Sequence, residues 1–225
     1  MNKIRGERLT KNYNGVIGIK EVDIEIEKGE VVVIIGPSGS GKTTLLNLLA
    51  LIDKPTEGKV FIDDVDTENL TERQLSKIRN EKFGFIFQFY YLIPELKVIE
   101  NVVLPLWIKE KQFKSDFLKE GEKYLSAFGI FDKKDTYPSK LSGGQLQRVA
   151  ICRSLICQPE IIFADEPTAN IDNETAKIFF EFMKNFNQEK KMTFVIATHN
   201  EKFLQFATKV VYLIEGKIKK VEKRR

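Results

Sequence analysis

Short apolar runs, separated by polar and glycine-containing turns, mark both ends of the chain. Segment 22–26 alternates apolar and acidic residues, and segment 30–35 is a nearly continuous β-branched run, the pattern of a buried strand. Further buried strands are predicted at 160–164, 193–198 and 209–214. Helical stretches separate the first three buried strands, which is typical of a mostly parallel sheet covered by helices.

The middle of the chain lacks strand signals between about Tyr90 and Gln158. Amphipathic segments at 114–128 and 144–157 predict helices in this region. We therefore expect one α/β domain in which a helical subdomain is inserted into a sheet domain. The predicted division of residues 1–225 is a sheet core at 1–88 and about 159–225, and a helical subdomain at about 89–158.

Composition fits a globular protein with one sizeable core, since 42% of the 225 residues are apolar and 30% are charged. No run reaches the roughly 18 to 20 apolar residues that cross a bilayer, and segment 1–10 is too charged for a signal peptide. A net charge of +4 argues against a nucleic-acid partner. The basic tail, 217–225, is either a solvated end or a contact with anionic lipid. Cys152 and Cys157 are expected to be reduced packing residues.

Segment 36–43, Gly-Pro-Ser-Gly-Ser-Gly-Lys-Thr, matches the phosphate-loop pattern G-x-x-x-x-G-K-[ST] between a predicted strand and a predicted helix, 43–51. The glycines let backbone N–H groups turn toward phosphates, and the helix N-terminus favours the same negative charge. We expect Lys42 to reach the β- and γ-phosphates of a bound nucleotide and the Thr43 hydroxyl to bind Mg²⁺. The predicted nucleotide-binding residues of this loop are Gly36, Pro37, Ser38, Gly39, Ser40, Gly41, Lys42, Thr43 and Thr44.

Two carboxylates follow the predicted strand 160–164. This arrangement is expected to bring Asp165 beside the Mg²⁺ ion, while Glu166 accepts a proton from a water in line with the γ-phosphate. An Asp-Glu pair after a strand can also cap a helix, but the phosphate loop upstream favours catalysis. The phosphate loop alone indicates a P-loop NTPase and leaves GTPase, kinase, helicase and transport motor open.

Segment 141–150, Leu-Ser-Gly-Gly-Gln-Leu-Gln-Arg-Val-Ala, resembles the signature sequence of the ABC ATPases. A hydroxyl and two glycines at a helix start expose N–H groups and form an anion site without a lysine. An ordinary N-cap explains the serine but not the whole string. The resemblance implies that ATP held by a second copy of the chain is contacted by Ser142, Gly143, Gly144 and Gln145.

Further positions match the ABC ATPase pattern over nearly the full chain. The resemblance implies that Tyr13 stacks on adenine, that Gln88 contacts Mg²⁺ and senses the partner, and that Asp172 lies in a loop crossing the dimer interface. His199, the only histidine, follows predicted strand 193–198. The resemblance implies that it hydrogen-bonds the γ-phosphate and holds the attacking water, as the histidine at this position does in the family. From the residues alone, a surface or core side chain is the less favoured alternative for Tyr13, and a lone histidine is usually a packed or solvated one. The predicted catalytic residues are Glu166 and His199, and the predicted metal ligands are Thr43, Gln88 and Asp165.

The resemblance implies an enzyme that converts ATP and water to ADP and phosphate. Two subunits would enclose two ATP molecules, each held between the phosphate loop of one subunit and segment 142–145 of the other. This cycle would drive a separate integral-membrane permease from the cytoplasmic face of the cell membrane. The aromatic and apolar segments 89–94 and 98–107 are the predicted permease contact, although most of their side chains are expected to pack the helical insertion. An antiparallel β part at the N-terminus completes the expected fold.

Segments 88–94, 100–102 and 166–172 are similar to the ATPases of lipoprotein release, macrolide-type efflux and bacterial cell division. Ala169 and Ile171 stand where that subgroup more often has Gly and Leu. Two alternatives stay open: the ATPase of an ordinary small-solute importer or exporter, and a regulatory ATP switch such as a cell-division scaffold. The helical insertion argues against a small GTPase, and the lack of heptads argues against chromosome-maintenance relatives.

Overall fold

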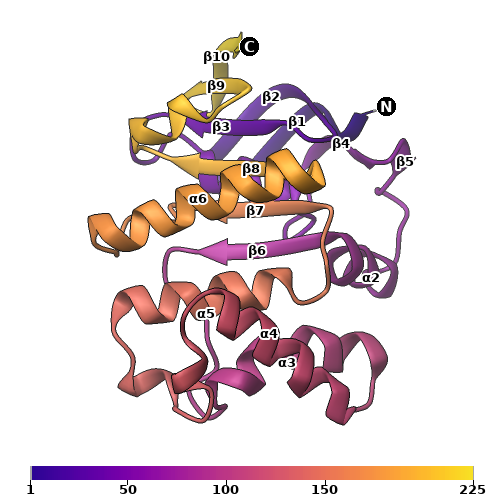
Figure 1. Cartoon of the computed structure of the whole chain (residues 1–225). Helices are drawn as coiled ribbons and strands as arrows, with labels where there is room; N and C mark the ends of the chain where they lie inside the picture. Colours follow the sequence, from indigo (N-terminus) through magenta and orange to yellow (C-terminus); the bar gives the residue numbers. More distant parts are fainter. Residues whose placement is uncertain (1, 225) are drawn as a thin grey trace.

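The computed structural model describes residues 2–224, which form two sheets and a surrounding set of helices (Figure 1). The strands are β1 (Asn2–Tyr13), β2 (Val16–Glu27), β3 (Val31–Ile35), β4 (Glu57–Ile62), β5 (Val65–Asp66), β6 (Phe83–Phe87), β7 (Ile161–Asp165), β8 (Thr193–Thr198), β9 (Lys209–Ile214) and β10 (Lys217–Lys223). The helices are α1 (Lys42–Leu49), α2 (Glu72–Lys82), α3 (Val98–Glu110), α4 (Ser115–Ala127), α5 (Gly143–Leu155) and α6 (Asn173–Lys190), with short 3-10 turns η1 (Phe131–Lys133), η2 (Pro138–Lys140) and η3 (Glu201–Gln205).

The smaller sheet is antiparallel, has the strand order β2-β1-β4-β5 and contains the N-terminal part of the chain. In β2, Val22, Ile24 and Ile26 are buried and the acidic residues between them are exposed, so the alternation predicted at 22–26 is confirmed. The expected antiparallel N-terminal part is therefore present.

The larger sheet has the strand order β10-β9-β3-β8-β7-β6. All neighbours pair in parallel except the edge strand β10, which is antiparallel to β9. The four buried strands predicted for this sheet correspond to β3, β7, β8 and β9. Strands β6 and β10 of this sheet were not predicted. Strand β6 begins at Phe83 directly after α2 ends at Lys82, and no turn residue marks the boundary. Strand β10 lies in the basic tail, for which the expectation was a solvated end or a lipid contact, and it pairs with β9 instead.

The apolar core lies on both faces of the larger sheet. Helix α1 lies between the two sheets and buries Leu45, Leu46, Leu48 and Leu49 completely. Helix α6 covers the opposite face and contributes Phe179 to a second apolar cluster (Figure 1). Because helices cover both faces, β3 and β8 are buried along their whole length.

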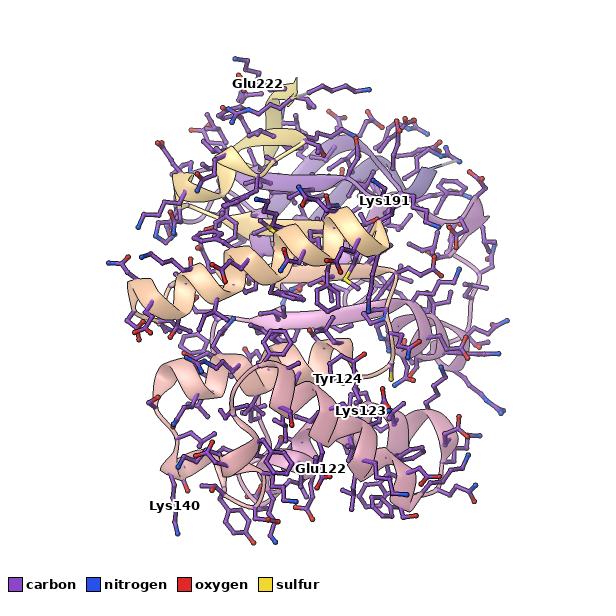
Figure 2. The ribbon with its side chains drawn as sticks, viewed as in Figure 1. Glu122, Lys123, Tyr124, Lys140, Lys191 and Glu222 are labelled. Carbon is purple, nitrogen blue, oxygen red and sulfur yellow. The ribbon has the colours of Figure 1, made fainter. Side chains whose placement is uncertain are left out.

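Helices α3, α4 and α5 form a separate layer beside β6 with an apolar cluster of its own (Figure 1). Tyr124 of α4, labelled in Figure 2, packs against both this cluster and the cluster under α6, so the helical layer and the sheet share a contact. These helices lie within the predicted insertion at about 89–158, whose status as a separate subdomain stays a prediction. Cys152 is buried and Cys157 half-buried, both as free thiols. None of the helices in residues 2–224 is long and apolar enough to cross a membrane.

Candidate active site

The loop between β3 and α1 is shaped by its glycines. Gly41 has φ 97°, and a Cβ atom there would lie 2.3 Å from the carbonyl oxygen of Gly18. At Gly36 a Cβ atom would lie 2.0 Å from the carbonyl oxygen of Leu213. No side chain caps the start of α1, so its first N–H groups point into the loop without an intrahelical partner. Such a helix start is an anion site.

Lys42 and Thr43 begin α1 at this helix start. The ammonium group of Lys42 donates to the carbonyl oxygens of Gly36 at 2.9 Å and Pro37 at 3.0 Å. Its side chain is therefore folded back over the loop, and the residue is 8% exposed. The position puts a cation at the same point as the free N–H groups, which reinforces the attraction for phosphate.

An open cavity of about 750 Å³ lies over the loop and draws its lining from five separate parts of the chain. Its lining residues are Tyr13, Val16, Ile17, Gly18, Ser38, Gly39, Gly41, Lys42, Thr43, Thr44, Gln88, Glu166 and His199. Ten of the residues predicted from the sequence to bind ATP or Mg²⁺ or to catalyse hydrolysis therefore line one cavity. Gly36, Pro37 and the buried Ser40 form the loop behind it.

Thr43 and Asp165 meet at the edge of this cavity. The Thr43 hydroxyl donates to the Asp165 carboxylate at 3.0 Å, although the two residues lie 122 positions apart. Burial raises the pKa of Asp165 and neighbouring Glu166 adds to the rise, while Thr43 and Lys42 oppose it. A hydroxyl, a carboxylate and the amide of Gln88 are the hard oxygen donors that suit Mg²⁺, so these residues fit the ion.

Glu166 is held by three contacts from the end of β8. One carboxylate oxygen accepts the Thr198 hydroxyl at 2.8 Å, and the other accepts the His199 N–H at 3.0 Å and lies 2.8 Å from His199 Nδ1. The backbone N–H of Glu166 donates to the carbonyl oxygen of Ala197 at 2.8 Å. The φ angle of Glu166 is 43°, a left-handed conformation that costs free energy in any residue other than glycine. These contacts fix a carboxylate at the cavity wall, close to Lys42 and Thr43.

Tyr13 ends β1 at the opposite wall of the cavity, and its side chain is half exposed, at 43%. Its ring lies against Gly18 and Thr44, because a Cβ atom at Gly18 would be 3.2 Å from the ring and 3.0 Å from Thr44 Cγ2. The phenol hydroxyl donates to Asp53 at 2.7 Å. The exposed face of the ring can therefore take a flat, apolar ligand group.

The predicted signature residues do not line this cavity. Ser142 caps α5: its N–H donates to Gln145 Oε1 at 2.9 Å, and its hydroxyl accepts the Gln145 N–H at 3.4 Å. Asp172 caps α6 by accepting the Thr175 N–H at 2.8 Å. A Cβ atom at Gly144 would lie 2.5 Å from Thr175 Oγ1, so the starts of α5 and α6 touch. These residues form a second cluster.

Two hydrogen bonds link the second cluster to the first. The side-chain amide of Asn170 donates to the carbonyl oxygen of Gln88 at 3.1 Å, and the Tyr90 hydroxyl donates to the carbonyl oxygen of Asn170 at 3.3 Å. These bonds tie Gln88 and Tyr90 to the loop that precedes α6.

Residues 19–169 match the family model described as ABC transporter. The chain belongs to the ABC transporter family. As an ABC ATPase it binds and hydrolyses ATP, and the expected P-loop fold is confirmed.

Two relatives cover nearly the whole ABC ATPase chain. The lipoprotein-releasing system ATP-binding protein LolD of Aquifex aeolicus is 41% identical over 96% of this chain and 95% of the relative. The uncharacterized ABC transporter ATP-binding protein MJ0796 of Methanocaldococcus jannaschii is 40% identical over 99% of this chain and 97% of the relative. A solved dimeric, post-hydrolysis structure of MJ0796 bound to ADP and Pi has a TM-score of 0.93 at 39% identity and covers 99% of both chains. The resemblance to the lipoprotein-release ATPases is thereby confirmed.

Sequence reasoning missed two residues of this ABC ATPase site. Thr198 directly precedes His199 at a strand end, and that position could have marked it as a neighbour of Glu166. Asp53 lies in a polar loop after α1 and carries no motif, so only its contact with Tyr13 reveals it.

Proposed function

We propose that this ATPase closes as a homodimer around two molecules of Mg-ATP and so drives a separate integral-membrane permease. The observation that carries the proposal is the division of the site. Lys42, Thr43 and Glu166 surround one cavity, whereas Ser142 and Asp172 belong to a second cluster outside it. A site that encloses ATP on both sides therefore needs the second cluster of another copy of the chain. Solved structures of MJ0796, titled as dimeric, support this arrangement.

Each residue of the cavity has a role in the proposed hydrolysis. The N–H groups at the start of α1 and the ammonium of Lys42 bind the β- and γ-phosphates. Thr43, Asp165 and Gln88 would hold Mg²⁺, which when bound neutralises negative charge on these phosphates. Glu166 accepts a proton from the attacking water.

His199 and Thr198 orient the carboxylate of Glu166 through the contacts described above, and His199 also reaches toward the γ-phosphate. Because only γ-phosphate-bearing nucleotide contacts both copies, its loss removes the interaction that favours the closed dimer. Opening and closing of the dimer then supply mechanical work.

The permease contact is proposed at an apolar groove beside β6. The groove has a volume of about 430 Å³, and Phe87, Tyr91, Pro105 and Ile108 are among its lining residues. Tyr91 and Ile108 are 63% and 58% exposed, so apolar surface is left uncovered in the single chain. A short helix of the permease fits such a groove and would keep the ATPase at the cytoplasmic face of the membrane.

The similarity to LolD supports work on a membrane-anchored cargo, such as lipoprotein extraction, transmitted mechanically through the permease. The links from Asn170 to Gln88 and Tyr90 support a route for that work, because they join the groove side of the molecule to the proposed dimer loop. Residues 89–158 would move as the helical subdomain that carries Ser142 and Gln145 of the second cluster.

The solution mass of the Glu166→Gln variant tests the proposal. Light scattering is measured without nucleotide, with ADP and with ATP. A dimer is expected with ATP alone, since the variant retains the binding residues and loses the proton acceptor. The double variant Lys42→Ala, Glu166→Gln is the control and should stay monomeric. A monomer in every condition, with ATP binding intact, would contradict closure by two copies of this chain.

A further inference from the structure

The loop that follows α1 fastens Asp53 to both the helix and the first strand. The backbone N–H groups of Ile52 and Asp53 donate to the carbonyl oxygen of Asn47 at 2.9 and 3.2 Å. Farther along the loop, the Thr56 N–H donates to the carbonyl oxygen of Thr10 at 2.8 Å. Asp53 therefore has a fixed backbone position relative to α1 and β1.

The Asp53 carboxylate is shared between two side chains of β1. One oxygen accepts the Tyr13 hydroxyl at 2.7 Å, and the other accepts the Lys11 ammonium at 2.6 Å and the Lys54 N–H at 2.7 Å. The same Lys11 ammonium donates to the Lys54 carbonyl oxygen at 2.7 Å and lies 5.0 Å from the centre of the Tyr13 ring. Tyr13 is thus held at its hydroxyl end by a carboxylate and flanked by a cation.

The charges of this group match its geometry. Burial favours the neutral form of Asp53, but the hydrogen bonds from Lys11, Tyr13 and Lys54 prevail and lower its pKa. Burial, followed by the hydrogen bond to Asp53, raises the pKa of Tyr13. At neutral pH the pair is a carboxylate and a neutral phenol, which is a charge-assisted hydrogen bond.

A chain of short contacts connects the phosphate loop to the tyrosine ring. The loop starts α1, α1 holds Asp53 through Asn47, and Asp53 holds the Tyr13 hydroxyl. Tyr13 is half exposed and is the last residue of β1, so the carboxylate is what fixes its hydroxyl end. The ring itself lies against Thr44 in the first turn of α1, beside the phosphate loop.

We propose that Asp53 is a positioning residue that holds the Tyr13 ring at a fixed place above the phosphate loop, ready to stack on the purine base of ATP. The proposal rests on the proposed ATP site, in which Tyr13 stacks on adenine as the ABC ATPase resemblance implies. A ring already held in its binding position loses less conformational freedom when the base arrives. Asp53 therefore acts on base recognition and leaves phosphate binding and chemistry unchanged.

Isothermal titration of the full chain with ATP and with inorganic tripolyphosphate, both in EDTA to prevent hydrolysis, tests the proposal. The variants are Asp53→Asn, Tyr13→Phe, their double variant and Tyr13→Ala, with exposed Asp116→Asn on α4 as the control. Asp53→Asn and Tyr13→Phe should each weaken ATP binding by about five- to tenfold, the range for having to order one side chain when the ligand binds. The double variant should be no weaker than either single variant, because both remove the same bond. Tripolyphosphate binding should not change in any variant.

The outcomes separate the inference from the function on which it rests. If Tyr13→Ala lowers the affinity for ATP while Asp53→Asn keeps the wild-type affinity, the role of Asp53 is overturned and the contact of Tyr13 with the base stands. A Tyr13→Ala variant with wild-type ATP affinity would overturn both. Equal weakening of ATP and tripolyphosphate by Asp53→Asn would also overturn the proposal, because it would mean that the phosphate loop itself had moved.

Discussion

The Nδ1 atom of His199 lies 2.8 Å from a carboxylate oxygen of Glu166, and the backbone N–H of His199 donates to the same oxygen. The two predicted catalytic residues, from different strand ends, therefore form one unit. Thr198 completes it by holding the second carboxylate oxygen. Removing the imidazole leaves the other two donors in place, which allows its contribution to be measured separately.

His199→Ala is expected to lower kcat for ATP hydrolysis by about a hundredfold, the lower range for a group that assists proton transfer. ATP affinity should change little, because Lys42 and the loop N–H groups bind the phosphates. Steady-state hydrolysis and equilibrium binding are measured on the same preparation. Thr198→Val is the comparison variant, since it removes one hydrogen bond to Glu166 and keeps the imidazole. Wild-type kcat in His199→Ala would exclude a catalytic role.

Lys42→Ala should weaken ATP binding by about 30- to 150-fold, which corresponds to the loss of charge-assisted hydrogen bonds worth about 2 to 3 kcal/mol. The fold should be retained, because the Lys42 ammonium contacts only the carbonyl oxygens of its own loop. Titration with ATP measures the affinity, and circular dichroism checks the fold. Lys119→Ala, at an exposed site on α4, is the control and should bind like the wild type. Equal affinities in both variants would refute the role of Lys42.

Gly41→Ala and Gly39→Ala separate steric from conformational strain in the loop. Both residues have positive φ, but an added Cβ atom meets Gly18 O at 2.3 Å from position 41 and nothing within 4 Å from position 39. Gly39→Ala should cost about 1 to 2 kcal/mol from its backbone conformation, and Gly41→Ala about 1 to 3 kcal/mol more. Thermal unfolding measures the difference, at roughly 2 to 4 °C per kcal/mol for a chain of this size. Equal melting temperatures would contradict the close packing of Gly41.

Asp172→Asn tests the charge at the start of α6. Its hydrogen bond from the Thr175 N–H lowers the pKa of Asp172. A lowered folded-state pKa means that the charged residue contributes stability above its unfolded-state pKa, about 3.9, and that this contribution is lost as the pH falls further. The wild type should therefore melt higher than Asp172→Asn between pH 5 and 7, with a difference that shrinks below about pH 4. If the difference in melting temperature between the two proteins grows toward acid pH, the charged form of Asp172 does not stabilise the fold and this account is refuted.

The two thiols should react slowly in the native protein. Burial raises the pKa of Cys152 well above that of an ordinary thiol and raises the pKa of Cys157 to about 11. At pH 8 only about 0.1% of Cys157 is then thiolate, the reactive form. A chromogenic disulfide reagent should label both thiols in guanidinium chloride and almost none in native buffer over the same minutes. Rapid labelling of one thiol in the native protein would contradict the burial of these side chains.

Sequence pattern was enough for the central strands of the larger sheet because their signals were local. The β-branched runs at β3 and β8 are buried on both faces, and such runs have few other uses in a globular protein. Strand β6 was not predicted, because it follows α2 directly and no turn separates the two elements. Its place at the sheet edge depends on pairing with β7, far along the chain, which no local pattern encodes.

For the site, the sequence by itself determined the chemical groups: the phosphate loop with Lys42 and Thr43, the carboxylates Asp165 and Glu166, and the lone His199. These stand in short motifs whose residue types are set by phosphate and proton chemistry. Only the tertiary structure decided which groups meet, such as Thr43 with Asp165 and Tyr13 with Asp53. The physical reason for the first contact is that parallel strands bring their carboxyl ends to one edge of the sheet, which places the start of α1 beside the end of β7. The second contact depends on how α1 packs against β1 of the smaller sheet. Those contacts depend on how strands pair and helices pack, and no single segment of the sequence contains them.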